Sequence, residues 1–462
     1  MSIKVPIFII LSIFQSSFLF SQKTRKKPNI VFILIDDLGY SDVGYVNQKA
    51  GVSTPNIDKL KDKGATFTNA YAACPVCSPT RASILTGKYP SSLKLTCHIP
   101  GIGMEKYIAK NNKGKKFMEA EFIDRLPLEE VTFAEVLKEY RYNTAFMGKW
   151  HLAGEGYAKS LDGVLRPQFH PDKQGFDLNI AGCAYGQPAS YFSPYKNGTL
   201  SDGLEGEYLT DRLGDEACKY IEDNKDDPFL LYFSTYSVHT PLQVPEDMTL
   251  KFNGNKYLAM IAIMDRNVGK IVQKIEELSL DDNTLIVLYS DNGGLWGNKP
   301  LRSIKGSLLE GGIRVPMIFS LPGKIPKGST IDVPVTSPDI FPTILEAAGV
   351  DHKKYKQVEG ESLWPLLTQK QAEIDRAIYW HYPHHRTTEK SMASAIREGD
   401  WKMIWEFESG ELSLFNLRDD IGETINLAGK YPEKLKSMHI KLKEWQKATY
   451  AQMPKLNPSY EN

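Results

Sequence analysis

The chain has 462 residues, of which 42% are hydrophobic and 24% are charged, so its composition allows a large buried core. Lysine and arginine together number 56, as do aspartate and glutamate, and the formal net charge is therefore zero. This balance argues against nucleic acid as the main partner, because nucleic-acid-binding proteins carry excess positive charge to neutralise phosphates.

The beginning of the chain has the pattern of an export signal. Lys4 is followed by an apolar run from Val5 to Phe20 and then by Ser21. The run is short for a membrane span, and polar residues such as Gln15 interrupt it. We interpret residues 1–21 as a cleaved signal peptide rather than a buried strand or a stable membrane anchor. The protein is therefore expected to be exported, to the periplasm or to the medium.

Continuous apolar runs alternate with helical patterns over residues 22–370. Such alternation is typical of mostly parallel strands covered on both faces by helices. Thr132 and Glu135 form a capping box at one helix start, Ser337-Pro338 predicts another, and amphipathic spacing predicts a long helix over 256–278. The runs predicted as strands are residues 29–35, 143–147, 228–234, 284–290 and 315–320.

The pattern changes after residue 370. Residues 395–417 alternate in polarity around two turns, and a lysine-rich amphipathic helix is predicted over about 433–449. We therefore predict an α/β fold, with a large, mixed, mostly parallel sheet sandwiched by helices over 22–370. A small α+β subdomain built on an antiparallel sheet is predicted over 371–462.

Polar residues follow four of the predicted strands. Because the carboxyl ends of parallel strands meet at one edge of an open sheet, we expect these residues to form a ligand site. Aspartate and asparagine oxygens suit calcium or magnesium and would hold zinc or copper poorly. Each pair alone is more typical of a solvated turn or loop, and their common location favours a site. In chain order the residues are Asp36-Asp37, Lys149 with His151, His239, and Asp291-Asn292.

Residues 77–87 read CSPTRASILTG and predict a short helix that ends at Gly87. Cys77 would lie at its N-terminus, where free N–H groups and the helix dipole favour negative charge. Five cysteines, an odd number, do not indicate a disulfide scaffold. From these residues alone three interpretations are open. Cys77 forms a redox pair or disulfide with Cys74, it is a nucleophile beside His151 or His239, or its thiol is converted into another group.

The stretch CSPTRASILTG resembles the signature of the type I sulfatases, in which the cysteine of a Cys-x-Pro-x-Arg core becomes Cα-formylglycine. IDDLGY, GKWHL, SVHTP, SDNGG, EGGIRVP and LFNLRDDIGETINLA resemble further motifs of this family, in family order, over residues 28–428. The resemblance implies the fold of the alkaline-phosphatase superfamily. It also implies a sulfuric ester hydrolase similar to exported bacterial polysaccharide sulfatases.

The resemblance implies a metal site and a sulfate site. The ion would be calcium in preference to magnesium, and Lys149 and Lys305 would bind the sulfate group. The metal ligands would be Asp36, Asp37, Asp291, Asn292 and an oxygen of the modified Cys77.

Catalytic roles are also implied by the resemblance. Arg81 would steady the hydroxyls of the hydrated aldehyde at Cys77, and Asp291 would accept the proton of the hydroxyl that attacks sulfur. His239 would protonate the departing sugar oxygen. His151 would help the second hydroxyl to expel sulfate.

The resemblance also implies the substrate, a sulfated oligosaccharide from an algal polysaccharide such as ulvan, carrageenan or fucoidan. A formylglycine-generating enzyme or an anaerobic sulfatase-maturating enzyme is the partner expected during biosynthesis. Two segments are candidates for sugar contacts: residues 166–173 with His170, and the run that contains His384, His385 and Arg386, for which a solvated loop is the alternative. The alternatives are a phosphonate or phosphate ester hydrolase of the same superfamily, or an inactive exported glycan-binding protein.

Overall fold

The computed structural model of the chain describes residues 27–47, 51 and 53–460. The predicted signal peptide, residues 1–21, lies outside these ranges. Within them, every helix is too short or too polar to cross a lipid bilayer.

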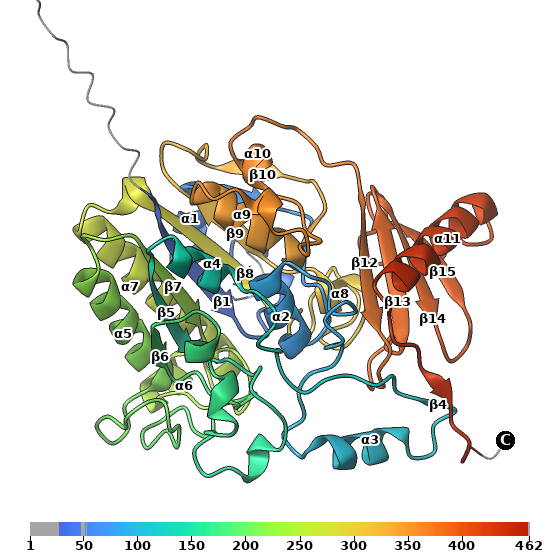
Figure 1. The fold of residues 1–462 in the computed structure, drawn as a ribbon, viewed down its shortest axis with the longest axis horizontal. Coiled ribbons are helices and arrows are strands. Elements are labelled where there is room, and N and C mark those ends of the chain that lie inside the picture. The colour runs from blue at the N-terminus through green and yellow to red at the C-terminus, as the bar shows by residue number, and fades with distance from the viewer. Residues whose placement is uncertain (1–26, 48–50, 52, 461–462) are drawn as a thin grey trace, which may run out of the picture.

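An eight-stranded, mostly parallel sheet lies at the centre of the fold (Figure 1). It contains the five predicted strands, with ends shifted by no more than two residues. β9 runs antiparallel to β8 and β2, so the sheet is mixed, as predicted. The order across the sheet is β10 (Ser329–Ile331), β2 (Ala65–Phe67), β9 (Met317–Ser320), β8 (Thr284–Ser290), β1 (Asn29–Ile35), β7 (Phe229–Ser234), β5 (Asn143–Gly148) and β6 (Leu178–Ile180).

Helices cover both faces of this sheet. Successive side chains of a strand point to opposite sides, so a strand that is apolar throughout must be buried on both faces. In β1, Phe32 and Leu34 pack on the side of α2 (Cys77–Thr86), α4 (Phe133–Glu139) and α9 (Ile340–Ala347). Val31 and Ile33 pack on the side of α1 (Pro55–Asp62), α5 (Leu209–Asp223) and α7 (Lys256–Glu277). The continuous apolar run of β1 is therefore explained by burial on both faces.

The two predicted helix starts differ in outcome. The capping box of α4 is confirmed, because Thr132 Oγ1 accepts the N–H of Glu135 at 3.1 Å and Glu135 Oε2 accepts the N–H of Thr132 at 2.8 Å. A 3-10 turn, Ser337–Asp339, leads into α9, and its cap is Thr336 rather than Ser337, with Asp339 accepting the Thr336 N–H at 2.8 Å; the cap of α9 itself is Asp339. Ser337 Oγ instead accepts the N–H of Ala73.

The connecting segments contain further short elements. The remaining helices of this part are α3 (Met104–Asn112), α6 (Glu246–Lys251), α8 (Glu310–Ile313) and α10 (Trp364–Leu367). Two-stranded pairs join β3 (Ala70–Tyr71) to β11 (Val335–Thr336) and β4 (Phe117–Met118) to β16 (Lys455–Leu456). Single 3-10 turns span Tyr40–Asp42, Tyr157–Lys159, Pro167–Phe169, Pro171–Lys173, Asp281–Asn283, Ser337–Asp339 and His352–Lys354.

The predicted antiparallel sheet near the C-terminus is confirmed, and Figure 1 shows it beside the large sheet. Helix α11 (Pro432–Ala448) packs on one face of it through Met438 and Leu442. We propose the boundary between the two parts near residue 370, between α10 and β12. The strands are β12 (Ala377–Tyr382), β13 (Ala393–Glu398), β14 (Trp401–Glu406) and β15 (Leu412–Asn416).

A buried group of charged residues joins the two parts. We call it the interface cluster, and Lys402 of β14 is its centre. Lys402 Nζ lies 2.8 Å from Glu310 Oε1 of α8 and 2.8 Å from Glu423 Oε1. Glu310 Oε2 accepts hydrogen bonds from Arg314 and Tyr71 at 2.7 Å. Each carboxylate oxygen of the cluster thus has a cation or a donor beside it. The cluster consists of Tyr71, Glu310, Arg314, Arg397, Lys402 and Glu423.

Candidate active site

The carboxyl ends of β8, β1, β7 and β5 lie side by side, and backbone hydrogen bonds join them. The Asp36 N–H donates to the Ser237 carbonyl at 3.0 Å, and the Lys149 N–H donates to the Ser234 carbonyl at 2.7 Å. Gly148 permits this approach, because its φ is +106° and a Cβ there would lie 1.9 Å from the Ser234 oxygen. The polar residues that follow the four strands therefore meet at one edge of the sheet.

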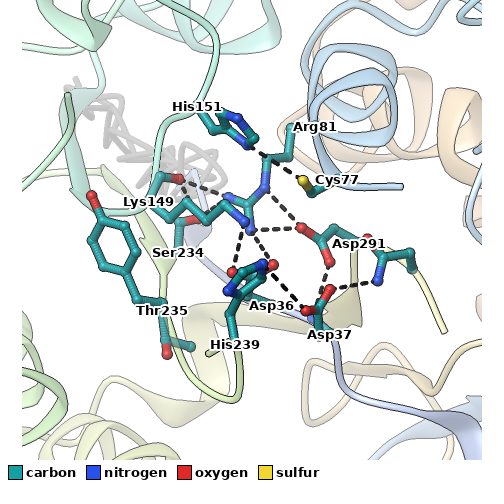
Figure 2. A network of polar contacts seen from close by, with 12 residues as sticks. Asp36, Asp37, Cys77, Arg81, Lys149, His151, Ser234, Thr235, His239 and Asp291 are labelled. Carbon is teal, nitrogen blue, oxygen red and sulfur yellow. Dashed lines mark hydrogen bonds and ion pairs between the residues drawn. The ribbon is translucent and has the colours of Figure 1, made fainter. Parts of the chain in front are cut away.

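Asp36, Asp37 and Asp291 form a buried group of carboxylates at this edge (Figure 2). Each has an oxygen within 4.8 Å of an oxygen of the other two. Burial raises the pKa of Asp36 well above its ordinary value, and the charges of Asp291 and Asp37 add to that effect against the opposing charge of Lys149. A cation among these groups would relieve their mutual repulsion.

Three oxygens at this edge have no hydrogen-bond partner among the described residues. They are Oδ1 of Asp36, Oδ2 of Asp37 and Oδ1 of Asn292. The amide of Asn292 donates to Asp37 Oδ1 at 2.7 Å, which leaves its own oxygen free beside the carboxylates. Unpartnered buried oxygens are costly, and calcium or magnesium takes carboxylate and amide oxygens as ligands. The donor set therefore fits a divalent cation.

Three basic side chains contact the carboxylates. Arg81 of α2 lies 2.8 Å through Nε and 2.7 Å through NH2 from Asp291 Oδ2, and its NH1 donates to the Lys149 carbonyl at 2.7 Å. Lys149 Nζ lies 2.7 Å from Asp36 Oδ2, and Lys305 Nζ lies 2.5 Å from Asp37 Oδ1. We call these three carboxylates and three cations the pocket cluster.

Cys77 begins α2, whose C-terminal residue is followed by Gly87 in a left-handed conformation, as predicted. Its Sγ lies 3.3 Å from Nδ1 of His151. The other ring nitrogen of His151 lies 2.9 Å from the carbonyl of Ile99, which can only accept. The proton of the ring is thereby assigned to Nε2, and Nδ1 faces residue 77 as an acceptor. Burial and the nearby Lys149 lower the pKa of His151 well below its ordinary value, so the ring is neutral.

His239 follows β7 and is also held in a neutral state. Burial lowers its pKa to about 3, although Asp37 acts in the opposite direction from 3.6 Å. For Asp291, burial would raise the pKa, but Arg81 and Lys149 outweigh it and the pKa is lowered. In this structure Asp291 is therefore a weak base, and His239 would need a further anion, in addition to Asp37, to become protonated.

A pocket of about 400 Å³ opens above the cluster. Its lining includes Cys77, His151, His239, Lys305 and Arg386, all of which the sequence analysis selected. The lining also contains His98 and Tyr157, which the sequence analysis missed. His98 lies in a loop and Tyr157 begins a short 3-10 turn, both outside the recognised motifs, so no pattern in the sequence marks them.

His384 and His385 do not line this pocket, contrary to the prediction that grouped them with Arg386. Both are buried against other parts of the protein. Nε2 of His384 lies 2.8 Å from Thr96 Oγ1, and Nε2 of His385 lies 2.8 Å from the Phe117 carbonyl. Their ring nitrogens therefore contact the segment before α4 and hold it against the loop that follows β12.

The segment 166–173 also lies outside the pocket lining. His170 Nε2 contacts the Leu165 carbonyl at 3.0 Å, and Arg166 lies 2.5 Å from Asp124. These residues therefore contact a neighbouring turn and the segment around Asp124, and the expected sugar contact is not seen in the lining.

The chain is similar to known sulfatases over nearly its whole length. The family model described as "Sulfatase" matches residues 28–350, and the model of the C-terminal part of N-sulphoglucosamine sulphohydrolase matches residues 305–448. A protein named "Sulfatase" from Formosa agariphila is 30% identical, covering 95% of this chain and 92% of that protein.

Solved structures agree with this similarity. The structure of Ps i-CgsB in complex with k-i-k-neocarrahexaose is 30% identical, with a TM-score of 0.77 and coverage of 93% of this chain and 94% of that chain. The structure of the PsFucS1 sulfatase from Pseudoalteromonas sp. is 23% identical, with a TM-score of 0.71 and coverage of 94% and 92%. The latter similarity supports the fold alone.

Proposed function

Because the chain belongs to the sulfatase family and is a sulfuric ester hydrolase, we propose that it removes sulfate from a sulfated carbohydrate. We propose algal polysaccharide fragments, of the carrageenan, fucoidan or ulvan type, as its substrates. The similarity to a structure that contains a neocarrahexaose supports this substrate class. The observation that carries the proposal is Cys77 facing a neutral His151 in a pocket above three buried carboxylates.

We propose that a maturation enzyme converts Cys77 into Cα-formylglycine, whose hydrated aldehyde supplies a hydroxyl for attack on sulfur. His151 is suited to hold or take a proton at this position, because its unprotonated Nδ1 points at Sγ from 3.3 Å. Asp291 is the second candidate acceptor, but its hydrogen bonds to Arg81 and to the Asp37 N–H make it the weaker base.

Asp36, Asp37, Asp291 and Asn292 would hold a divalent cation, for which we propose calcium. When bound, such a cation lowers the pKa of a neighbouring hydroxyl and stabilises negative charge on sulfate oxygens. Arg81 fixes the orientation of Asp291 from α2, and so connects the helix that carries Cys77 to the carboxylates.

Lys149 and Lys305 are suited to bind the sulfate group, because their ammonium groups are held next to the carboxylates. Lys305 lines the pocket, whereas Lys149 is fully buried and outside its lining. His239 lines the pocket and is suited to face the leaving oxygen. Its pKa of about 3 rises when an anionic sulfate ester enters, since nearby negative charge favours imidazolium.

The test is turnover by protein co-produced with a maturation enzyme, with mass spectrometry of the Cys77 peptide to verify conversion. We expect desulfation of an aryl sulfate and of at least one defined sulfated oligosaccharide, loss of activity after chelation, and recovery with Ca²⁺. Cys77→Ala is the inactive control. Faster turnover of an aryl phosphate diester would favour the phosphate or phosphonate ester alternative. A fully converted protein that binds glycans without releasing sulfate would contradict the proposal.

We propose that the protein works in the periplasm, where residues 1–21 would direct it. Fractionation of the native cells with an antibody tests this location, and recovery of the protein in the cytosol with an intact N-terminus would contradict it.

A further inference from the structure

Arg386 lies in the pocket lining with its charge unpaired. Its Nε donates to the Tyr382 hydroxyl at 3.1 Å, and its NH2 donates to Nδ1 of His98 at 2.9 Å. Among the described residues it forms no ion pair with a carboxylate, whereas Lys149 and Lys305 each contact an aspartate. The side chain is exposed to solvent. It therefore offers positive charge to whatever enters the pocket.

The two groups that hold Arg386 are neutral. His98 Nδ1 accepts from the guanidinium, so the ring proton is assigned to Nε2. Burial and the charge of Arg386 lower the pKa of His98 well below its ordinary value, which keeps the ring uncharged. Tyr382 and His98 thus fix the direction of the guanidinium without neutralising it.

Arg386 also lies next to the proposed sulfate-binding lysine. A Cβ added to Gly306, the residue after Lys305, would lie 3.2 Å from Arg386 Cγ. Thr388 Oγ1 donates to the Gly306 carbonyl at 2.8 Å and holds the two segments together. Gly306 has a φ of +90°, so glycine both fits this backbone and leaves room for the arginine stem. The unpaired cation is therefore near the position proposed for the sulfate that is removed.

We propose that Arg386 binds a second anionic group of the substrate, a sulfate or a carboxylate carried near the sulfate that is removed, with His98 as its positioning residue. Guanidinium groups recognise both oxyanions through paired N–H donors, which explains the choice of a fixed arginine here. This inference rests on the proposed function and narrows its substrates to sugars with an additional negative charge.

The first experiment compares three substrates that share the sulfate to be removed: a hexose monosulfate, the corresponding hexose disulfate and a monosulfated uronic acid. We expect kcat/KM of the unsubstituted protein to be about tenfold higher on at least one doubly charged sugar than on the monosulfate. In Arg386→Gln this preference disappears, mainly through KM. A preference for the disulfate alone identifies sulfate as the second group, and one for the uronic acid alone identifies carboxylate.

Variants of His98 test the positioning role. His98→Ala should lose the preference for doubly charged sugars through a higher KM, at nearly unchanged kcat. His98→Gln should restore most of this preference, because the side-chain carbonyl of glutamine can accept a hydrogen bond from the guanidinium. Arg418→Gln, which removes an exposed arginine paired with Asp400, is the matched control and should keep the preference. Equal losses on all three sugars in Arg386→Gln and His98→Ala would overturn the inference.

A binding measurement separates this inference from the proposed function. Calorimetric titration of Cys77→Ala protein with the same three sugars requires no turnover. Tighter binding of a doubly charged sugar, lost in Cys77→Ala/Arg386→Gln, supports the inference even if the matured protein hydrolyses none of them. Equal affinity for all three sugars overturns it, even if an aryl sulfate is hydrolysed.

Discussion

Two buried clusters of charged side chains, the pocket cluster and the interface cluster, are built from similar residues but are paired differently. In the interface cluster each carboxylate oxygen of Glu310 and Glu423 has a cation or donor within 2.8 Å. In the pocket cluster Oδ1 of Asp36 and Oδ2 of Asp37 accept no hydrogen bond; Arg81 NH2 lies 3.7 Å from the first, and Nε2 of the neutral His239 lies 3.6 Å from the second. One ion cluster therefore joins the two parts of the fold, whereas the other has unpartnered oxygens, where we propose that a cation binds.

The difference follows from the elements that hold each cluster. The pocket cluster stands at the ends of parallel strands, where the chain turns and a pocket of about 400 Å³ opens. The interface cluster lies between α8 and β14, where Lys402 and Glu310 are fully buried. Removing a group should thus affect activity in the first cluster and stability in the second.

The largest expected effect is on activity. Asp37→Asn keeps the shape of the side chain but removes one charge from the pocket cluster, so it should lower kcat/KM on an aryl sulfate by about a thousandfold. Its melting temperature should fall less than that of Lys402→Met, since Lys305, the cation that loses its charged partner, is partly exposed and lines the pocket. Initial rates and thermal unfolding measure both. A folded Asp37→Asn protein with ordinary activity would show that this cluster has only a structural role.

The next effect is on stability. Lys402→Met leaves Glu310 and Glu423 buried without their shared cation, which should lower the free energy of unfolding by about 3 to 5 kcal/mol. Lys434→Met, which breaks a partly exposed pair with Glu398, is the matched control and should cost less than about 1 kcal/mol. Denaturant unfolding of both variants measures the difference. Similar small losses in both would contradict a special role for the interface cluster.

A smaller effect should appear in the pH dependence of stability. Burial raises the pKa of Glu423 to about 7, and the negative charge of Glu310 adds to this against the attraction of Lys402. Glu423 therefore keeps its proton to a higher pH in the folded state than in the unfolded state. Its contribution to the free energy of unfolding falls as pH rises toward 7. From pH 5 to pH 8, Glu423→Gln should gain about 1 to 3 kcal/mol of stability relative to the unsubstituted protein.

Glu398→Gln is the control for this pH series. Burial would raise the pKa of Glu398, but hydrogen bonds from Lys434 and Lys441 outweigh burial and lower it. The stabilising contribution of Glu398 is fully present above the pKa that this residue has in the unfolded chain. The contribution is lost only as pH falls below that value. The melting temperature difference of this variant should therefore be constant between pH 5 and pH 8, and a parallel result for Glu423→Gln would refute the assignment.

The smallest expected effect concerns His385, which the structure separates from Arg386. Its ring contacts the Phe117 carbonyl and lies away from the pocket lining. His385→Ala should change the ratio of oligosaccharide to aryl sulfate activity by less than about twofold, with a small loss of stability from the removed hydrogen bond. Paired rate measurements on the two substrates decide this. A loss of activity on the oligosaccharide alone would show that His385 contacts the substrate.

The sequence by itself determined the parallel strands of the centre, the helix at Cys77 and most of the pocket. This was possible because residues that follow parallel strands are brought to one edge by the sheet, so Asp36, Lys149, His239 and Asp291 could be grouped from local patterns alone. Only the tertiary structure decided that β9 runs antiparallel and that Thr336 caps the 3-10 turn before α9.

The pairing of His98 with Arg386, 288 residues apart, was likewise decided by the tertiary structure. The same holds for the burial of His384 and His385 and for the contact of Lys402 with Glu310. These features depend on how the C-terminal sheet packs against the large domain. Packing between distant segments depends on the shape and charge of whole surfaces, which no short stretch of residues contains.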